Sequence, residues 1–127
     1  MRHILAACVL ALAPAMASAD GFYNRDVGDG GAPAACMARA RQAIEAYARR
    51  IGMPNTTVYD GSWTVAAYGL QPGNVNVQIA CPYRSDRAEI VLVTAHSTGT
   101  EQDRITAVEG VSAIWDTIGQ GGVTPGK

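Results

Sequence analysis

The residue types that could do chemistry are few in this 127-residue chain. The most reactive pair is His96 and Ser97, which follow the apolar run Ile90-Val91-Leu92-Val93. A Ser-His-Asp centre needs the serine hydroxyl within hydrogen-bond reach of the imidazole and a carboxylate behind it. Adjacent strand residues point to opposite faces, so the two side chains are poor partners. We therefore assign no catalytic residue, and keep a small hydrolase or transferase using His96 as an alternative.

The first nineteen residues have the pattern of a secretory signal peptide. Arg2 and His3 form a charged start, residues 4–12 are apolar, and Ala17-Ser18-Ala19 is a small-x-small cleavage site. The apolar run is shorter than the roughly 20 residues that a membrane helix needs. We expect cleavage after Ala19 and a secreted or periplasmic protein that is not attached to a membrane.

Cleavage would remove Cys8 and leave an even pair, Cys36 and Cys81. In an exported chain such a pair is most simply a structural disulfide, because the compartment is oxidising and a small core gains from a cross-link. Redox-active pairs usually have a Cys-x-x-Cys spacing, and this pair does not. The sequence therefore predicts a Cys36–Cys81 disulfide.

Metal, phosphate and nucleic-acid patterns are weak. The stretch from Asp26 to Gly31 is rich in Asp and Gly but lacks the twelve-residue ligand order of an EF-hand. No Gly-Lys-Ser/Thr phosphate loop occurs. Without Arg2, nine basic residues face eleven acidic ones, a formal net charge of −2. This balance gives no reason to expect a nucleic acid or an anionic membrane as partner, and we expect no metal and no cofactor.

One stretch combines clear strand periodicity with polar side chains that could bind a partner. From residue 74 to residue 82 the sequence alternates, so one face of the strand is apolar and the other carries Asn76 and Gln78. The apolar face also contains Cys81. Aromatic residues gather in the same region of the sequence: Tyr59, Trp63, Tyr68 and Tyr83. Because aromatic anchors dominate interface energetics, we expect Asn76 and Gln78 to lie on a binding face for a protein, peptide or glycan.

Two helices are expected to flank the strands. Residues 33–51 begin with a proline, are rich in alanine and end before Gly52 and Pro54. An apolar stripe at helical spacing includes Cys36, so this face should pack on the sheet. Thr100 is the expected N-cap of a second helix that ends at Gly119.

The strands should form an antiparallel meander. We expect strands at residues 56–59, 62–68, 74–82 and 89–94, the first two forming either a hairpin or one bent strand around Asp60-Gly61. The predicted fold class is α+β: a two-layer sandwich of helix, three- or four-stranded antiparallel meander and helix, with both helices on one sheet face. We expect a flexible arm at residues 20–32, one domain at residues 33–119 and a disordered tail at residues 120–127.

These features favour a small exported protein without enzymatic activity that binds another molecule through its sheet face or loops. Besides the enzyme, a second alternative is an inhibitor of a secreted enzyme. It would use residues 82–87, a loop that could present a rigid wedge.

Overall fold

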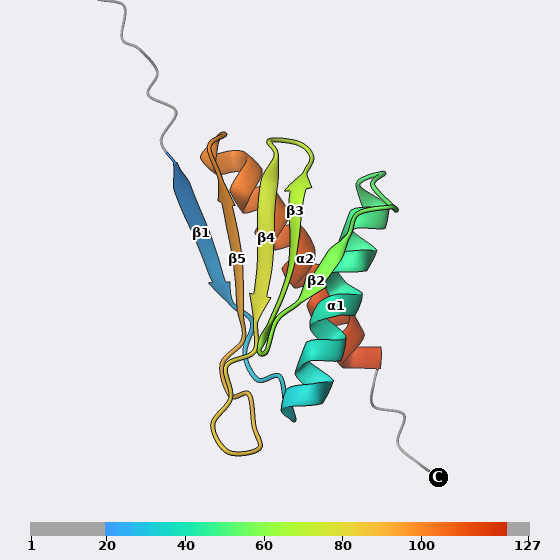
Figure 1. Ribbon diagram of the computed structural model, residues 1–127, viewed down its shortest axis with the longest axis vertical. Helices are drawn as coiled ribbons and strands as arrows, with labels where there is room; N and C mark the ends of the chain where they lie inside the picture. Colours follow the sequence, from blue (N-terminus) through green and yellow to red (C-terminus); the bar gives the residue numbers. More distant parts are fainter. Residues whose placement is uncertain (1–19, 122–127) are drawn as a thin grey trace, which may run out of the picture.

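The structure is a computed structural model, and it describes residues 20–121. Within these residues the chain forms one five-stranded antiparallel sheet and two helices (Figure 1). The elements in chain order are β1 (Gly21–Asp26), α1 (Pro33–Arg50), β2 (Val58–Asp60), β3 (Thr64–Leu70), β4 (Val75–Ala80), β5 (Leu92–Ser97) and α2 (Glu101–Gly121). In the sheet the strands lie in the order β1-β5-β4-β3-β2.

Both helices pack on the same face of this sheet, which confirms the predicted α+β sandwich. Helix α1 contacts β2 and β3, whereas α2 contacts β1, β4 and β5. In Figure 1, α2 runs behind the strands and α1 stands at the right beside β2 and β3, and neither helix covers the sheet face that is turned toward the viewer. We call the face without helices the open face.

The alternation in β4 determines which side chains enter the core. Val75, Val77 and Ile79 are almost completely buried, whereas Gln78 is exposed. Burial of apolar surface stabilises the fold by about 25 cal/mol per Å². A shift of the strand by one residue would expose these three side chains to water, so their burial fixes the register. The predicted inward and outward faces of this strand are therefore confirmed.

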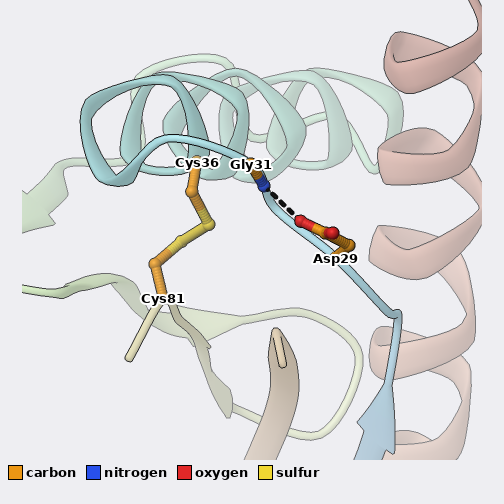
Figure 2. The surroundings of a disulfide bond; sticks show 4 residues. All are labelled: Asp29, Gly31, Cys36 and Cys81. Atoms are coloured by element: carbon orange, nitrogen blue, oxygen red, sulfur yellow. Dashed lines mark hydrogen bonds between the residues drawn. A yellow bond between two sulfur atoms is a disulfide. The ribbon is translucent and has the colours of Figure 1, made fainter. Parts of the chain in front are cut away.

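The predicted disulfide is also confirmed. Cys36 on α1 and Cys81 after β4 are both fully buried and joined, with Cα atoms 6.1 Å apart. Figure 2 shows the bond crossing from the helix layer to the sheet layer. Beside it, the backbone N–H of Gly31 donates to Asp29 Oδ1 at 2.7 Å and closes a turn between β1 and α1. The bond therefore links the two layers through the core.

The two helices approach each other closely at Gly110. A Cβ atom at Gly110 would lie 2.5 Å from Tyr47 Cε2, so only glycine leaves room for this ring. Nearby, the Arg39 guanidinium lies over the Trp115 ring at 3.8 Å and donates to the Trp115 carbonyl oxygen from Nε and Nη2, at 3.1 and 2.6 Å. The two helices are thus held together by close packing at Gly110 and by charge-assisted hydrogen bonds from Arg39.

The largest difference from the sequence-based expectation is β1. The sequence predicts a flexible arm at residues 20–32, yet Gly21–Asp26 pairs with β5 along its whole length. Tyr23 packs against the core, and Arg25 forms an ion pair with Glu109 of α2. The strand is ordered because its backbone N–H and C=O groups pair with those of β5 at the edge of the sheet.

Other boundaries differ by small amounts. The last strand is Leu92–Ser97 rather than residues 89–94, and residues 56–59 and 62–68 form a hairpin of β2 and β3. Helix α2 continues to Gly121, two residues beyond the expected end at Gly119. The predicted signal peptide and most of the predicted tail lie outside the described residues. Between residues 20 and 121, no helix is long and apolar enough to cross a membrane.

Candidate binding groove on the open sheet face

The strand register arranges the open-face side chains in rows that cross the sheet. One row contains Phe22 of β1, His96 of β5 and Asn76 of β4, because both Phe22 and Asn76 are paired with His96. The next row contains Asn24, Thr94, Gln78, Ala66 and Tyr59, from β1 to β2. All five strands therefore contribute to one surface, although their residues are as much as 74 positions apart in the chain.

Within these rows lies a hollow of about 200 Å³, which we call the open-face groove. Its floor is low because Ala66 and Thr94 have short side chains between larger neighbours. Its lining consists of aromatic, amide and hydroxyl side chains together with two small or apolar residues: Phe22, Ala66, Tyr68, Asn76, Val77, Gln78, Thr94 and His96. Both residues predicted from the sequence as binding residues, Asn76 and Gln78, line the groove.

Asn76 also has a structural task. The pairing of β3 with β4 is irregular between Ala67 and Leu70, and Gly69 in this bulge has a φ of +72°. The backbone N–H of Gly69 donates to Asn76 Oδ1 at 3.1 Å. A φ of this sign suits glycine, which has no Cβ. Asn76 therefore uses its oxygen to hold the bulge and can offer its NH₂ group to a ligand.

Gln78 stands at the centre of the floor. It is paired with Ala66 on one side and Thr94 on the other. Its side chain is exposed, and a glutamine amide offers both a carbonyl acceptor and two N–H donors. Thr94, half-buried, adds a hydroxyl that can donate and accept.

Aromatic pairs stand at both ends of the groove. On the β1 side the rings of Phe22 and His96 have centroids 4.6 Å apart and planes tilted by 36°. On the β3 side Tyr68 contacts Tyr59, with centroids 5.5 Å apart. Phe22 and Tyr68 nevertheless remain 69% and 58% exposed. Each wall therefore has a neighbouring ring for support and a large surface for contact.

His96 is part of the groove and not of a Ser-His pair. Its Nε2 lies 3.3 Å from Asp20 Oδ1 on the open face. Ser97 is buried on the other side of the sheet, where Arg104 Nη1 contacts its carbonyl oxygen at 3.2 Å and its hydroxyl at 3.4 Å. The two side chains therefore cannot act on one substrate, as the strand geometry predicted.

The arginines near the sheet are directed away from the groove. Arg25 is the one lysine or arginine in the five described strands, and it pairs with Glu109 on the helix side. Arg41 of α1 binds Asp60 at 2.5 Å, and these hydrogen bonds raise the pKa of the Arg41 guanidinium. Among the described strand residues, no lysine or arginine projects from the open face, whereas Asp26 belongs to it.

A second exposed surface surrounds the loop after β4. Arg84 and Arg87 exchange backbone hydrogen bonds of 3.1 and 3.3 Å, and Ser85 between them has a φ of +59°. Arg87 also pairs with Asp29, and this hydrogen bond lowers the pKa of the Asp29 carboxyl group. A hollow of about 230 Å³ lies here, lined by Pro82, Tyr83, Arg84, Arg87, Glu89 and Ile90. The loop projects beyond the end of the sheet at the bottom of Figure 1.

The Asp- and Gly-rich segment after β1 forms turns. Asp26 Oδ1 accepts the N–H of Gly28 at 2.8 Å, and Asp29 accepts that of Gly31. Across the part of the chain that the structure describes, no group of three or more His, Cys, Asp and Glu side chains could hold a metal ion.

Comparisons with known proteins add no functional information: the chain matches no protein-family model, no curated protein and no solved structure.

The sequence indicated the centre of the groove but not its wall on β1. The sequence predicts a flexible arm at Phe22, and it does not connect Thr94 or His96 with Asn76. Phe22, Asn24 and Asp26 share one face of β1, but residues 21–26 have no alternation of apolar and polar side chains that would predict a strand.

Proposed function

We propose that this protein is an exported binding protein without enzymatic activity and that its open-face groove holds part of another molecule. The observation that carries the proposal is the groove itself: exposed aromatic rings at both ends and an amide-and-hydroxyl floor between them. Concave sites with apolar walls and a few convergent polar groups are typical of ligand binding. The leader pattern and the disulfide support export.

Filling the groove tests this function. Thr94→Trp places a large ring on the floor, whereas Asn24→Trp adds the same ring beside it, on the same row but outside the lining. Both proteins would be immobilised with the wild type and exposed to an extract of the producing cell and to its growth medium. We expect a molecule retained by the wild type and by Asn24→Trp but not by Thr94→Trp. Equal retention by all three proteins would refute the groove as the binding site.

Export is tested by mass spectrometry of the protein isolated from outside the cytoplasm. We expect a chain that begins at Asp20 and contains no free thiol. A chain that still carries residues 1–19 would contradict the predicted cleavage.

The projecting loop supports a second candidate function, inhibition of a secreted enzyme. Its closed Arg84–Arg87 turn and the ion pair to Asp29 hold it in one shape, and Tyr83 is 55% exposed beside it. A preorganised loop loses little conformational entropy on binding. If this surface is used, Tyr83→Ala should abolish retention of the partner, and Thr94→Trp should leave it unchanged.

A further inference from the structure

We propose that the ligand of the open-face groove is an uncharged saccharide, of which one or two rings lie over β4 and β5 against an aromatic wall. This inference rests on the proposed binding function and names the chemical class of the ligand. The juxtaposition that carries it is the central amide of Gln78 between the exposed rings of Phe22 and Tyr68.

The size of the groove limits the ligand. Its volume of about 200 Å³ is smaller than the roughly 300–1,000 Å³ of sites for drug-sized molecules. The strands that carry the two walls, β1 and β3, are separated by three strand spacings, a backbone distance of roughly 14 Å. Single sugar rings and disaccharides fall in this range, whereas a folded protein surface would not enter the hollow.

The lining matches the two kinds of surface on a sugar ring. A pyranose has an apolar face of C–H groups that packs on an aromatic ring and a rim of hydroxyls that donate and accept hydrogen bonds. Phe22 and Tyr68 supply rings, while Gln78 and Thr94 supply donors and acceptors. Asn76 supplies two N–H donors, while its oxygen already accepts one hydrogen bond from the backbone N–H of Gly69. The polar groups lie on the floor and the rings at the ends, so one ligand can use both.

Charge distinguishes a neutral ligand from an anionic one. The described strands place no lysine or arginine on the open face, so a phosphate or carboxylate would find no fixed cation there. The carboxylates of Asp20 and Asp26 border the β1 side and would repel an anion. An uncharged ligand keeps the hydrogen bonds without this cost.

An extended peptide fits the floor less well. Peptides that add to sheets bind through backbone groups of an edge strand. The floor belongs to β4 and β5, which are paired on both sides within the sheet. Their backbone groups are therefore already used, and side chains must make the polar contacts.

A titration followed by NMR tests the ligand class. The probes are glucose, galactose, mannose, N-acetylglucosamine, maltose, cellobiose and lactose, with glucuronate as an anionic probe and a capped uncharged tripeptide as a peptide probe. We expect at least one neutral sugar to cause saturable shifts of the backbone amides of Gln78 and Thr94. Tyr68→Ala should weaken this binding about tenfold, the loss typical of an aromatic anchor.

Tyr83→Ala is the matched control, because Tyr83 is 55% exposed and Tyr68 is 58% exposed, but Tyr83 lies outside the groove. It should change the affinity by less than twofold. Gln78→Glu keeps the side-chain size, removes the donors and adds a charge, and it should weaken binding as well.

Several results would overturn the proposal that the ligand is a saccharide. These are no shift of groove residues with any neutral sugar, tighter binding of glucuronate, or equal losses in Tyr68→Ala and Tyr83→Ala. If the tripeptide alone shifts the same amides, the groove is a binding site for peptides. The saccharide proposal then fails, whereas the proposed binding function stands. If no probe binds and Thr94→Trp leaves retention from the extract unchanged, the binding function fails too.

Discussion

Replacing both cysteines of the disulfide with alanine should lower the free energy of unfolding by about 4 kcal/mol. Cys36 and Cys81 are 45 positions apart in the sequence. In the chain-entropy model, a cross-link over this separation restricts the unfolded chain by about 4 kcal/mol at 25 °C. For a domain of this size, such a loss corresponds to a decrease in Tm of roughly 15 to 30 °C.

Denaturant unfolding of the wild type and the double variant Cys36→Ala/Cys81→Ala measures this effect. A cross-linked denatured chain exposes less surface, so the slope m should be larger in the variant than in the wild type. The wild type unfolded in a reducing buffer is the control. It keeps both buried sulfur atoms and lacks the cross-link, so its difference from the double variant isolates the packing of the sulfurs.

Two results would refute this reasoning. A loss of less than about 1 kcal/mol in the double variant would show that the bond restricts the unfolded chain little. Alternatively, reduction of the wild type could leave its stability unchanged while the double variant is strongly destabilised. The stabilisation would then come from packing in the core and not from the cross-link.

Three further predictions concern contacts between the layers and the loops. Gly110→Ala should lower the Tm, because the new Cβ would collide with the Tyr47 ring, and this cost exceeds the higher helix propensity of alanine. An unchanged or higher Tm would contradict this close approach. Arg104→Met should lower the free energy of unfolding by about 2 to 3 kcal/mol, because the buried guanidinium donates to the carbonyl oxygens of Ser97, at the end of β5, and of Gly99 in the loop that follows. Urea unfolding measures this loss, and an unchanged stability would contradict the prediction. Asp29→Asn removes the charge that pairs with Arg87 and keeps the turn. Because the folded-state pKa of Asp29 is lowered, its stabilisation is present above the unfolded pKa of about 4 and is lost as the pH falls through the folded value. The difference in Tm between wild type and variant should therefore be larger at pH 7 than at pH 2, and a difference independent of pH would argue against the ion pair.

The central strand and the disulfide were predictable because each depends on a local pattern. Residues 75–80 alternate with a period of two, and burial of the apolar set leaves only one register for the strand. The pairing of Cys36 with Cys81 followed from counting, since a chain without its leader holds no third cysteine. The N-cap was also visible, and Thr100 Oγ1 accepts the N–H of Asp103 at 3.1 Å.

The first strand was not predictable in the same way. Gly21–Asp26 has one partly buried aromatic residue facing the core, Tyr23, and is otherwise largely exposed. Its own composition favours a loop, and its order comes from pairing with β5, more than 60 positions later in the chain. A prediction from local residues alone does not contain this contact.

The sequence by itself thus determined which face of β4 packs on the helices, which cysteines form the disulfide, and that Asn76 and Gln78 point outward. The alternation of side chains along a strand and the number of cysteines are properties of the chain alone. Only the tertiary structure decided that Phe22 and His96 stand beside these amides and that Tyr68 closes the other side of the groove. The reason is physical: the order of strands in a sheet depends on pairing between distant segments, and no local pattern specifies it.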